Sequence, residues 1–402
     1  VLAVSGLLIN FIVAYFYSSE GLGIFNQTYA LFVIFSQFSS FGIHYSVLKL
    51  SSEESKDLKS SSEILISGML SVLLISLLFS LLFYLLSGLL ADLLESPFMA
   101  TTIKIASAAL IFFSLNKVLL SFINGQERLR LFAIGNILRY IFMLLSLIAL
   151  ISLRFPIKDI SYIFLISEFS LTIFCLIFVF KVFKPFKVQA IYKRSIKHIR
   201  FGLKALLSGL SVELNSRVDV VILGIFASDA IVGAYSFFAL VAEGFYNVYV
   251  VVKNILNPKV TKLLKVKDHL NLKKLISKTQ RIIYPISIIL VLMISVFIFF
   301  IIPYIPDSNI FYENYLTLII LMTSILLISG FIPFEIILTL GGRPELQSLQ
   351  TMITLVLNIT LNLVLIPWYL AFGAAFATAL SWIFGVIILN IFVFRYIGVR
   401  IV

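Results

Sequence analysis

The stretch KVFKPFKVQAIYKRSIKHIR, residues 181–200, is the longest basic segment of the 402-residue chain and lies close to its middle. Apolar runs of about 20 residues, the length that crosses a bilayer as a helix, recur along the sequence on both sides of it. Six such runs precede the segment and six follow it. The basic stretch therefore divides the chain into two halves with the same number of predicted membrane spans.

The composition indicates membrane insertion along the whole chain. Hydrophobic residues make up 61% of the sequence and charged residues 12%, against about 25% charged residues in soluble domains. The runs lack the alternation over about ten residues that marks the strands of a membrane barrel. Since a helix satisfies its backbone groups within one segment, we predict an all-α polytopic membrane protein with about 12 transmembrane helices. The expected spans are 1–17, 22–49, 63–90, 100–122, 131–152, 160–182, 202–226, 230–256, 281–304, 313–338, 347–367 and 371–395.

Positive charge is distributed unevenly between the loops on the two sides of the predicted membrane. One set of loops holds about 23 of the 31 Lys and Arg residues, and the other holds Arg154 and Lys158. Because Lys and Arg are retained on the cytoplasmic side, we predict that the first set and both termini are cytoplasmic. This topology accounts for the net charge of +12, so we expect no nucleic-acid partner. The cytoplasmic loops are 50–62, 123–130, 183–201, 257–281 and 339–346.

Two pairs of short motifs indicate that the halves are related. SSEGLGIF at 18–25 opens the second span and SDAIVGAY at 228–235 opens the eighth, while GQER at 125–128 and GGRPE at 341–345 precede the fifth and eleventh spans. Paired repeats with substrate bound between them are a common transporter plan. We therefore expect two six-helix lobes related by a pseudo-two-fold axis. They are 1–182, with a first span that we expect to be truncated because Val1 lies inside an apolar run, and 202–402, joined by a basic cytoplasmic linker at 183–201.

Several classes of function are disfavoured by what the sequence lacks. No GxxxxGK[ST] loop is present, so we expect no ATP hydrolysis. The longest outer loop is about nine residues, which argues against a membrane polymerase or ligase, because such enzymes need a large polar segment outside the bilayer. Cys175 is the single cysteine, and the three histidines lack metal-ligand spacing. We expect no catalytic residues, no metal and no cofactor.

The seventh span, GLSVELNSRVDVVILG at 209–224, is the most polar. Asn215 and Asp219 lie on one helical stripe, and Glu213 and Arg217, four residues apart, lie on the opposite face. Ionisable groups in lipid cost at least a few kcal/mol, so each needs a partner or a wet cavity. One face of this helix is therefore expected to border a cavity and the other a neighbouring helix.

Cations inside the spans are candidates for binding an anionic headgroup, since the planar guanidinium of Arg can bind two phosphate oxygens. The alternatives are a purely structural Glu213–Arg217 pair, and lysines that extend to the interface. Acids and amides are candidates for cavity lining or for ion or proton coupling, with helix capping and interhelical hydrogen bonding as the alternatives. The candidate cations are Arg217, Arg139, Lys117 and Lys253, and the candidate polar residues are Asp219, Glu213, Glu243, Asn215 and Glu168.

The basic linker itself has two interpretations. Lys193, Arg194, Lys197 and Arg200 follow helical spacing, which is typical of a helix lying on an anionic leaflet. The alternative is a solvated linker whose charge enforces topology.

Four stretches carry small motifs that recur in one family of membrane proteins. They are SSEGLGIFNQTYALFVIFSQFSSFG at 18–42, NSRVDVVILGIFASDAIVGAYSFFALVAEGF at 215–245, NPKV at 257–260 and GGRPELQSLQTMITLVLNITLNLVLIPWYLAFGAAFATALS at 341–381. The first resembles the early part, the second the seventh and eighth helices, and the last two later regions of the O-antigen flippases and related polysaccharide transporters of the multidrug/oligosaccharidyl-lipid/polysaccharide exporter superfamily. The resemblance runs over nearly the whole chain through many small motifs.

The resemblance implies a flippase that moves an undecaprenyl-diphosphate-linked oligosaccharide across a bacterial cytoplasmic membrane by alternating access, in lipopolysaccharide O-antigen or related polysaccharide biosynthesis. It implies a cationic cavity, which suits Arg217, Arg139 and Lys117. Coupling to H⁺ or Na⁺ stays open, and a polysaccharide polymerase and chain-length proteins are the expected partners of a monomer. The alternatives are a drug/cation antiporter of the same superfamily, with an acidic and aromatic site, and the disfavoured polymerase.

Overall fold

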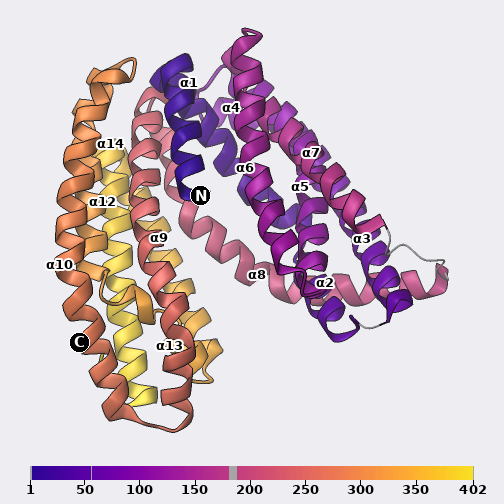
Figure 1. Cartoon of the computed structure of the whole chain (residues 1–402). Coiled ribbons are helices and arrows are strands. Elements are labelled where there is room, and N and C mark those ends of the chain that lie inside the picture. Colours follow the sequence, from indigo (N-terminus) through magenta and orange to yellow (C-terminus); the bar gives the residue numbers. More distant parts are fainter. Residues whose placement is uncertain (1, 56, 181–187, 402) are drawn as a thin grey trace. The chain divides into compact units, whose positions relative to one another are not determined.

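The computed structural model describes residues 2–55, 57–180 and 188–401, and these residues form helices joined by turns and short connections, without strands (Figure 1). The chain forms two compact units, one made of Val1–Ile9 and Ile24–Arg217 and the other of Asn10–Gly23 and Val218–Val402. These units are defined by which residues lie close together in space and not by the number of spans in each. The lobe boundaries predicted from span number stay a prediction.

Unit 1 contains most of α1 and the helices up to the greater part of α8. Helices α3 and α7 pack on α5, and α6 packs on α7 (Figure 1). A buried cluster that includes Val47, Ile64, Val118, Leu171 and the single cysteine, Cys175, joins α2, α3, α5 and α7. The helices are α1 (Leu2–Ser40), α2 (Ile43–Glu53), α3 (Leu58–Leu85), α4 (Ser87–Leu93), α5 (Met99–Gly125), α6 (Leu129–Ser152), η1 (Ile157–Asp159), α7 (Tyr162–Val179) and α8 (Val188–Phe226).

Unit 2 contains the remaining helices and the segment of α1 around its kink. Helix α12 packs on α9, α10 and α14. A second buried cluster includes Val260 of α9, Ile276 of α10, Phe334 of η4 and Val393 of α14, and it holds these helices together. The helices are α9 (Asp229–Lys265), α10 (His269–Ile301), η3 (Ile302–Tyr304), α11 (Ser308–Glu313), α12 (Tyr315–Ile328), η4 (Ile332–Phe334), α13 (Ile337–Leu340) and α14 (Pro344–Ile397).

The described helices accommodate the twelve predicted spans. Eight are long and apolar enough to cross a membrane, and α12 with the η4–α13 segment, bent by 54°, makes a ninth. Two of the eight are broken by non-helical residues, α1 at Ser18 and α14 at Leu370, and each accounts for two spans. If α14 were straight, its 54 residues would extend about 80 Å. This is more than twice the hydrocarbon thickness of about 30 Å, so α14 is long enough for two spans.

Helix α8 supplies the remaining span, although its charged residues keep it out of the apolar set. It runs without a break from Val188 to Phe226, so the described part of the predicted linker and the predicted seventh span are one helix. The beginning of that linker, residues 183–187, lies outside the described residues.

The predicted second span, 22–49, is interrupted in the structure. Helix α1 ends at Ser40, and α2 begins at Ile43. Phe41 and Gly42 between them have φ angles of 48° and 66°, a left-handed backbone that ends a helix. A Cβ atom on Gly42 would lie 2.6 Å from the Gly202 carbonyl oxygen. The break therefore lets α2 pass closely beside α8 within unit 1.

The repeated motifs 18–25 and 228–235 meet within unit 2. A Cβ atom on Gly23 would lie 1.8 Å from the Asp229 carbonyl oxygen, and a Cβ atom on Gly233 would lie 2.1 Å from the Ser19 carbonyl oxygen. Small residues allow such close backbone approach between membrane helices. The shared glycine of the two motifs is therefore explained by a reciprocal contact, in which each glycine faces the start of the other motif.

We expect Gly23→Ala to lower the stability of the purified protein by about 1–3 kcal/mol, because the added methyl group forces two backbones apart. Gly88→Ala is the matched control, because a Cβ atom at Gly88 meets nothing within 4 Å and alanine favours a helix. Thermal unfolding in detergent measures both. An unfolding temperature of Gly23→Ala equal to that of Gly88→Ala would contradict the close contact.

Candidate functional site

A cavity of about 110 Å³ lies inside unit 1. Its wall combines aromatic, apolar and charged side chains from five helices, which is the mixture expected of a ligand pocket. The lining residues are Tyr29, Phe32, Val33 and Ser36 of α1, Phe113 of α5, Arg139, Tyr140 and Met143 of α6, Phe164 and Glu168 of α7, and Glu213 and Arg217 of α8.

An ion pair between Arg139 and Glu168 forms one side of the cavity. Arg139 Nε lies 2.9 Å from Glu168 Oε1, and the side chains are 17% and 4% exposed. Asn116 Nδ2 donates to Glu168 Oε2 and to the Glu168 carbonyl oxygen, both at 2.8 Å, and Thr172 Oγ1 donates to Asn116 Oδ1 at 3.0 Å. Because the carboxylate is held by α5 and α6 together, the arginine is fixed in place at the cavity wall.

Phe113 brings two cations to this region. Its ring centre lies 4.9 Å from the guanidinium carbon of Arg139 and 5.0 Å from Nζ of Lys117, distances at which a ring attracts a cation. Lys117 Nζ also donates to Ser36 Oγ at 3.4 Å. Lys117 thus contacts two lining residues, Ser36 and Phe113, from beside the cavity.

Helix α8 contributes one acid and one base, Glu213 and Arg217, to the lining of the cavity. Gln37 Nε2 donates to Glu213 Oε1 at 3.1 Å, and the guanidinium carbon of Arg217 lies 5.3 Å from the ring centre of Tyr29. The expectation that one face of the seventh span borders a cavity agrees with this placement, because Glu213 and Arg217 both line it. The cavity therefore gathers two arginines and two glutamates, with Lys117 close by.

Other predicted residues lie elsewhere. Asn215 of unit 1 does not line this cavity, and within the described residues its buried Oδ1 accepts no hydrogen bond. Asp219 of unit 2 is buried and accepts hydrogen bonds from Tyr235 Oη at 2.5 Å and from the Val220 N–H at 2.8 Å. The bond from Tyr235 of α9 is an interhelical hydrogen bond, and a role of Asp219 in ion or proton coupling stays a prediction.

Lys253 and Glu243 also belong to unit 2. Lys253 Nζ lies 2.5 Å from Glu335 Oε1, and Tyr246 Oη donates to Glu335 Oε2 at 2.5 Å. Glu335 follows the bend after α12, so this pair ties α9 to a broken span. Glu243 is exposed, and its carbonyl oxygen accepts from Asn247 Nδ2 at 2.9 Å.

Sequence reasoning missed the uncharged members of the site. Asn116, Gln37 and Phe113 hold the charged groups in place, but a single phenylalanine has no distinguishing signal among the 39 in the chain. Asn116 did carry a signal, because an amide inside an apolar run also needs a hydrogen-bond partner.

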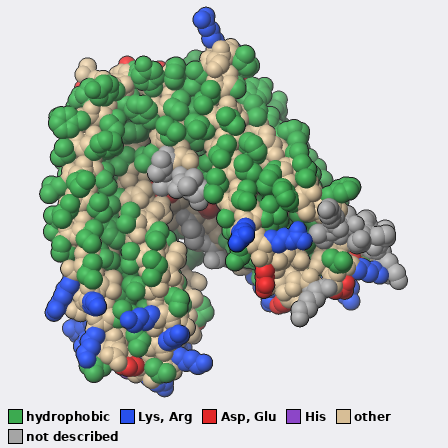
Figure 2. Space-filling model, in the orientation of Figure 1, with side chains coloured by type: hydrophobic (Ala, Val, Ile, Leu, Met, Phe, Trp, Pro, Cys, Tyr) green, Lys and Arg blue, Asp and Glu red, His purple; other side chains and the backbone are tan. Residues whose placement is uncertain are grey.

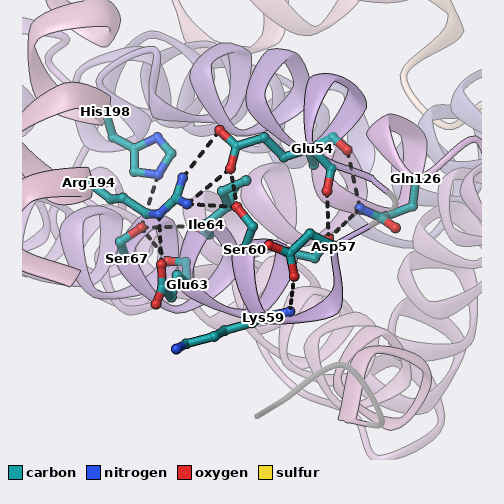
Figure 3. Close-up of polar contacts among 12 residues, drawn as sticks. Glu54, Asp57, Lys59, Ser60, Glu63, Ile64, Ser67, Gln126, Arg194 and His198 are labelled. Carbon is teal, nitrogen blue, oxygen red and sulfur yellow. Dashed lines mark hydrogen bonds and ion pairs between the residues drawn. The ribbon is translucent and has the colours of Figure 1, made fainter. Parts of the chain in front are cut away.

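The first part of α8 is bound to unit 1 through polar contacts (Figure 3). Arg194 Nη2 lies 3.0 Å from Glu54 Oε2 and Arg194 Nε lies 3.2 Å from Glu63 Oε2. His198 contacts Ser46 Oγ through Nδ1 at 2.9 Å and Ser67 Oγ through Nε2 at 3.1 Å.

Arg194 fits neither interpretation of the basic linker, because its guanidinium binds carboxylates of the protein, whereas both interpretations stay predictions for the rest of the segment. These contacts bind the linker helix to α2, α3 and the turn between them. Lys193, Lys197 and Arg200 of the same segment are exposed.

Burial and charge shift two pKa values in this cluster. Burial lowers the pKa of His198 from 6.5 to about 4, and the positive charges of Arg194 and Lys197 act in the same direction. Burial alone would raise the pKa of Glu54, but hydrogen bonds from Arg194 and Ser60 hold it below its usual value. At neutral pH the cluster therefore contains a neutral histidine and an ionised glutamate.

A polytopic helical bundle of this kind is the fold of the transporters of the MOP superfamily, as comparison with solved structures shows. The chain belongs to the polysaccharide biosynthesis protein family, whose model matches residues 2–264. Among curated proteins, none matches the sequence.

The chain is similar to an inward-facing multidrug resistance MATE family transporter of the MOP superfamily, with 13% identity, coverage of 99% of this chain and 95% of that chain, and a TM-score of 0.79. It is similar to the lipid II flippase MurJ in an inward closed conformation, with 16% identity, coverage of 97% and 85%, and a TM-score of 0.77. It is also similar to the eukaryotic MATE transporter AtDTX14, with 12% identity, coverage of 97% of this chain and 94% of that chain, and a TM-score of 0.63. At these identities the similarity shows the fold alone. Together with the long apolar helices of the chain, this fold makes the protein a multi-pass membrane protein.

We expect Glu168→Gln to destabilise unit 1 by about 3 kcal/mol, because it keeps an acceptor for Asn116 but leaves the Arg139 charge without its counter-charge. The matched control is Glu345→Gln. It removes an acid from the exposed Arg343–Glu345 pair, whose atoms are 3.7 Å apart and which contributes about 0–1 kcal/mol. Thermal unfolding in detergent compares the variants, and equal small shifts would contradict a stabilising role for the buried pair.

Stability should fall as pH is lowered from 6.5 towards 4. The unfolded chain takes up a proton at His198 near its ordinary pKa of 6.5, whereas the folded protein resists protonation down to about 4. The stabilisation is complete above 6.5 and decreases by up to about 3 kcal/mol below that pH. Glu54 adds a loss in the same direction at lower pH. Unfolding temperatures measured from pH 7 to 4 should drop less steeply for His198→Gln, and an identical slope would refute the assignment.

Proposed function

We propose that the protein moves an undecaprenyl-diphosphate-linked oligosaccharide, an O-antigen or related polysaccharide repeat unit, between the leaflets of the bacterial cytoplasmic membrane by alternating access. The observation that carries the proposal is a donor at the cavity wall. Within the described residues, Arg139 Nε and Nη2 are both buried and make no hydrogen bond, although Nε lies within ion-pair distance of Glu168. A buried donor on a cation is suited to an anionic oxygen, since charge-assisted hydrogen bonds are the stronger ones.

The surrounding charges support an anionic headgroup rather than a neutral one. Arg217 lines the same cavity, and Lys117 lies beside it. Glu168 and Glu213 offset two of these three positive charges, so the five groups together carry one net positive charge. A diphosphate would meet cations from α5, α6 and α8, and each of the two acids is hydrogen-bonded to an amide side chain, Asn116 or Gln37.

The rest of the lining suits the sugar portion. Tyr29 and Tyr140 are among the lining residues, and their rings would pack on carbohydrate rings while their hydroxyls would hydrogen-bond to sugar hydroxyls. The polyprenyl tail would stay in the bilayer, against exposed apolar helix faces. Coupling to H⁺ or Na⁺, cytoplasmic termini, a monomeric state and cooperation with a polysaccharide polymerase and chain-length proteins are parts of the same proposal.

A second candidate function is export of cationic drugs. Two acids, Glu168 and Glu213, lie among five aromatic lining residues, and an acidic aromatic site suits an organic cation through cation–π contacts. The multidrug resistance transporter of similar fold makes this the natural alternative. Against it, both acids already have partners in the protein, whereas the unsatisfied donor is on a cation.

We expect cells that lack the protein to retain the lipid-linked repeat unit in the cytoplasmic leaflet. We expect Arg139→Gln and Arg217→Gln each to slow translocation by about tenfold or more, because each removes a charge-assisted hydrogen bond of about 1.5–3 kcal/mol. The measurement is the leaflet orientation of the lipid-linked unit, probed with a membrane-impermeant reagent. Lys193→Gln is the matched control, because it removes an exposed cation from the linker.

An unchanged orientation in cells without the protein would eliminate the proposal. If drug susceptibility changes while the orientation does not, the antiporter function replaces it.

A further inference from the structure

The hairpin formed by the end of α9 and the start of α10 carries a dense group of exposed cations, which Figure 2 shows as blue side chains at one end of these helices. Helices of 37 and 33 residues are about 50 Å long or more, so they extend beyond a hydrocarbon layer of about 30 Å. The cations are Lys259, Lys262, Lys265, Lys267, Lys273, Lys274, Lys278 and Arg281.

Among the described residues these cations form no ion pair, and a single carboxylate, that of Asp268, lies near them and interacts with Lys274 at longer range. Asp268 is the sole acid between residues 257 and 281, and its carboxylate accepts hydrogen bonds from the N–H and the side chain of Asn271. No carboxylate of the described residues lies within ion-pair distance of any of the eight. Unlike Arg194, they leave their charge available to something outside the chain.

Three of the cations lie on one face of α10. Lys274, Lys278 and Arg281 are spaced by four and three residues, which places them above one another on a helix. The opposite face is packed, with Leu272 and Ile276 in the core of unit 2. The three charges therefore project away from the protein.

The same face continues as an apolar surface towards the other end of α10. Ile289, Leu292 and Val296 are 58%, 62% and 54% exposed and extend the spacing of four and three residues from Arg281. In a membrane protein such exposed side chains contact lipid tails. One helix face thus presents cations at one end and a tail-contacting surface beyond them, in the order of the headgroup and tails of a lipid.

We propose that this face of α10 binds an anionic phospholipid, with its headgroup phosphate at Lys278 and Arg281 and its tails along Ile289, Leu292 and Val296. Topology alone does not explain the pattern, because retention of positive charge on one side of a membrane depends on the number of charges and not on the helix face. The proposal rests on membrane insertion and is independent of the cargo.

The test uses the purified full chain in nanodiscs of phosphatidylcholine with or without phosphatidylglycerol, with lipid occupancy measured by native mass spectrometry. Lys278→Gln/Arg281→Gln should weaken phosphatidylglycerol retention by about 10- to 30-fold, since each interfacial cation contributes about 1 kcal/mol. The matched control, Lys267→Gln/Lys273→Gln, removes the same charge from the turn and from beside the packed face. It should change retention less than about twofold.

Equal losses in both double variants would overturn the site in favour of unspecific attraction by the hairpin, and unchanged retention in both would overturn it altogether. Undecaprenyl diphosphate is tested separately. If it displaces phosphatidylglycerol from the wild-type protein at equal concentration, the occupant is the cargo lipid and the phospholipid assignment fails. Thermal unfolding in phosphatidylcholine alone checks that both double variants are folded.

Discussion

The ion pair of Arg139 and Glu168 is the interaction on which the candidate site depends. In the interior of a membrane protein each of these charges alone would cost several kcal/mol, and their attraction offsets that cost only when the geometry is good and the remaining hydrogen bonds are made. Asn116 meets the second requirement for the carboxylate. The guanidinium keeps two buried nitrogens without a hydrogen bond among the described residues, Nε, which has only the ion pair, and Nη2, and this asymmetry makes the pair a candidate for binding as well as for structure.

Helix α8 connects this pair to the polar cluster around Arg194 and His198. Its first part is held on α2 and α3 by Arg194 and His198, and its later turns bring Glu213 and Arg217 to the cavity. Because the helix is continuous, contacts at one end constrain the position of charges at the other. The polarity that makes α8 the least apolar of the spans follows from these two attachments. The cations of the α9–α10 hairpin form no ion pair with the described residues, which is why an external anion is inferred for them.

Much of the architecture was predictable from the sequence, and the reasons differ from element to element. Long apolar runs such as 281–304 specify a span because lipid admits few alternatives to a helix. The repeated glycine of residues 23 and 233 was readable as a motif, but its reciprocal contact with Ser19 and Asp229 required coordinates. The break at Phe41 and Gly42 was not foreseen, because the apolar pattern continues through it and close passage beside Gly202 is a tertiary demand.

The sequence by itself determined that the chain crosses a membrane many times as helices, since hydrophobicity and backbone hydrogen bonding are properties of single segments. It also identified the charged residues that must find partners. The tertiary structure decided which partners they find. Arg139 pairs with Glu168, Lys253 with Glu335, and Arg194 with Glu54 and Glu63. Each pairing joins different helices, so it depends on helix rotation and packing, which no periodicity along one segment specifies.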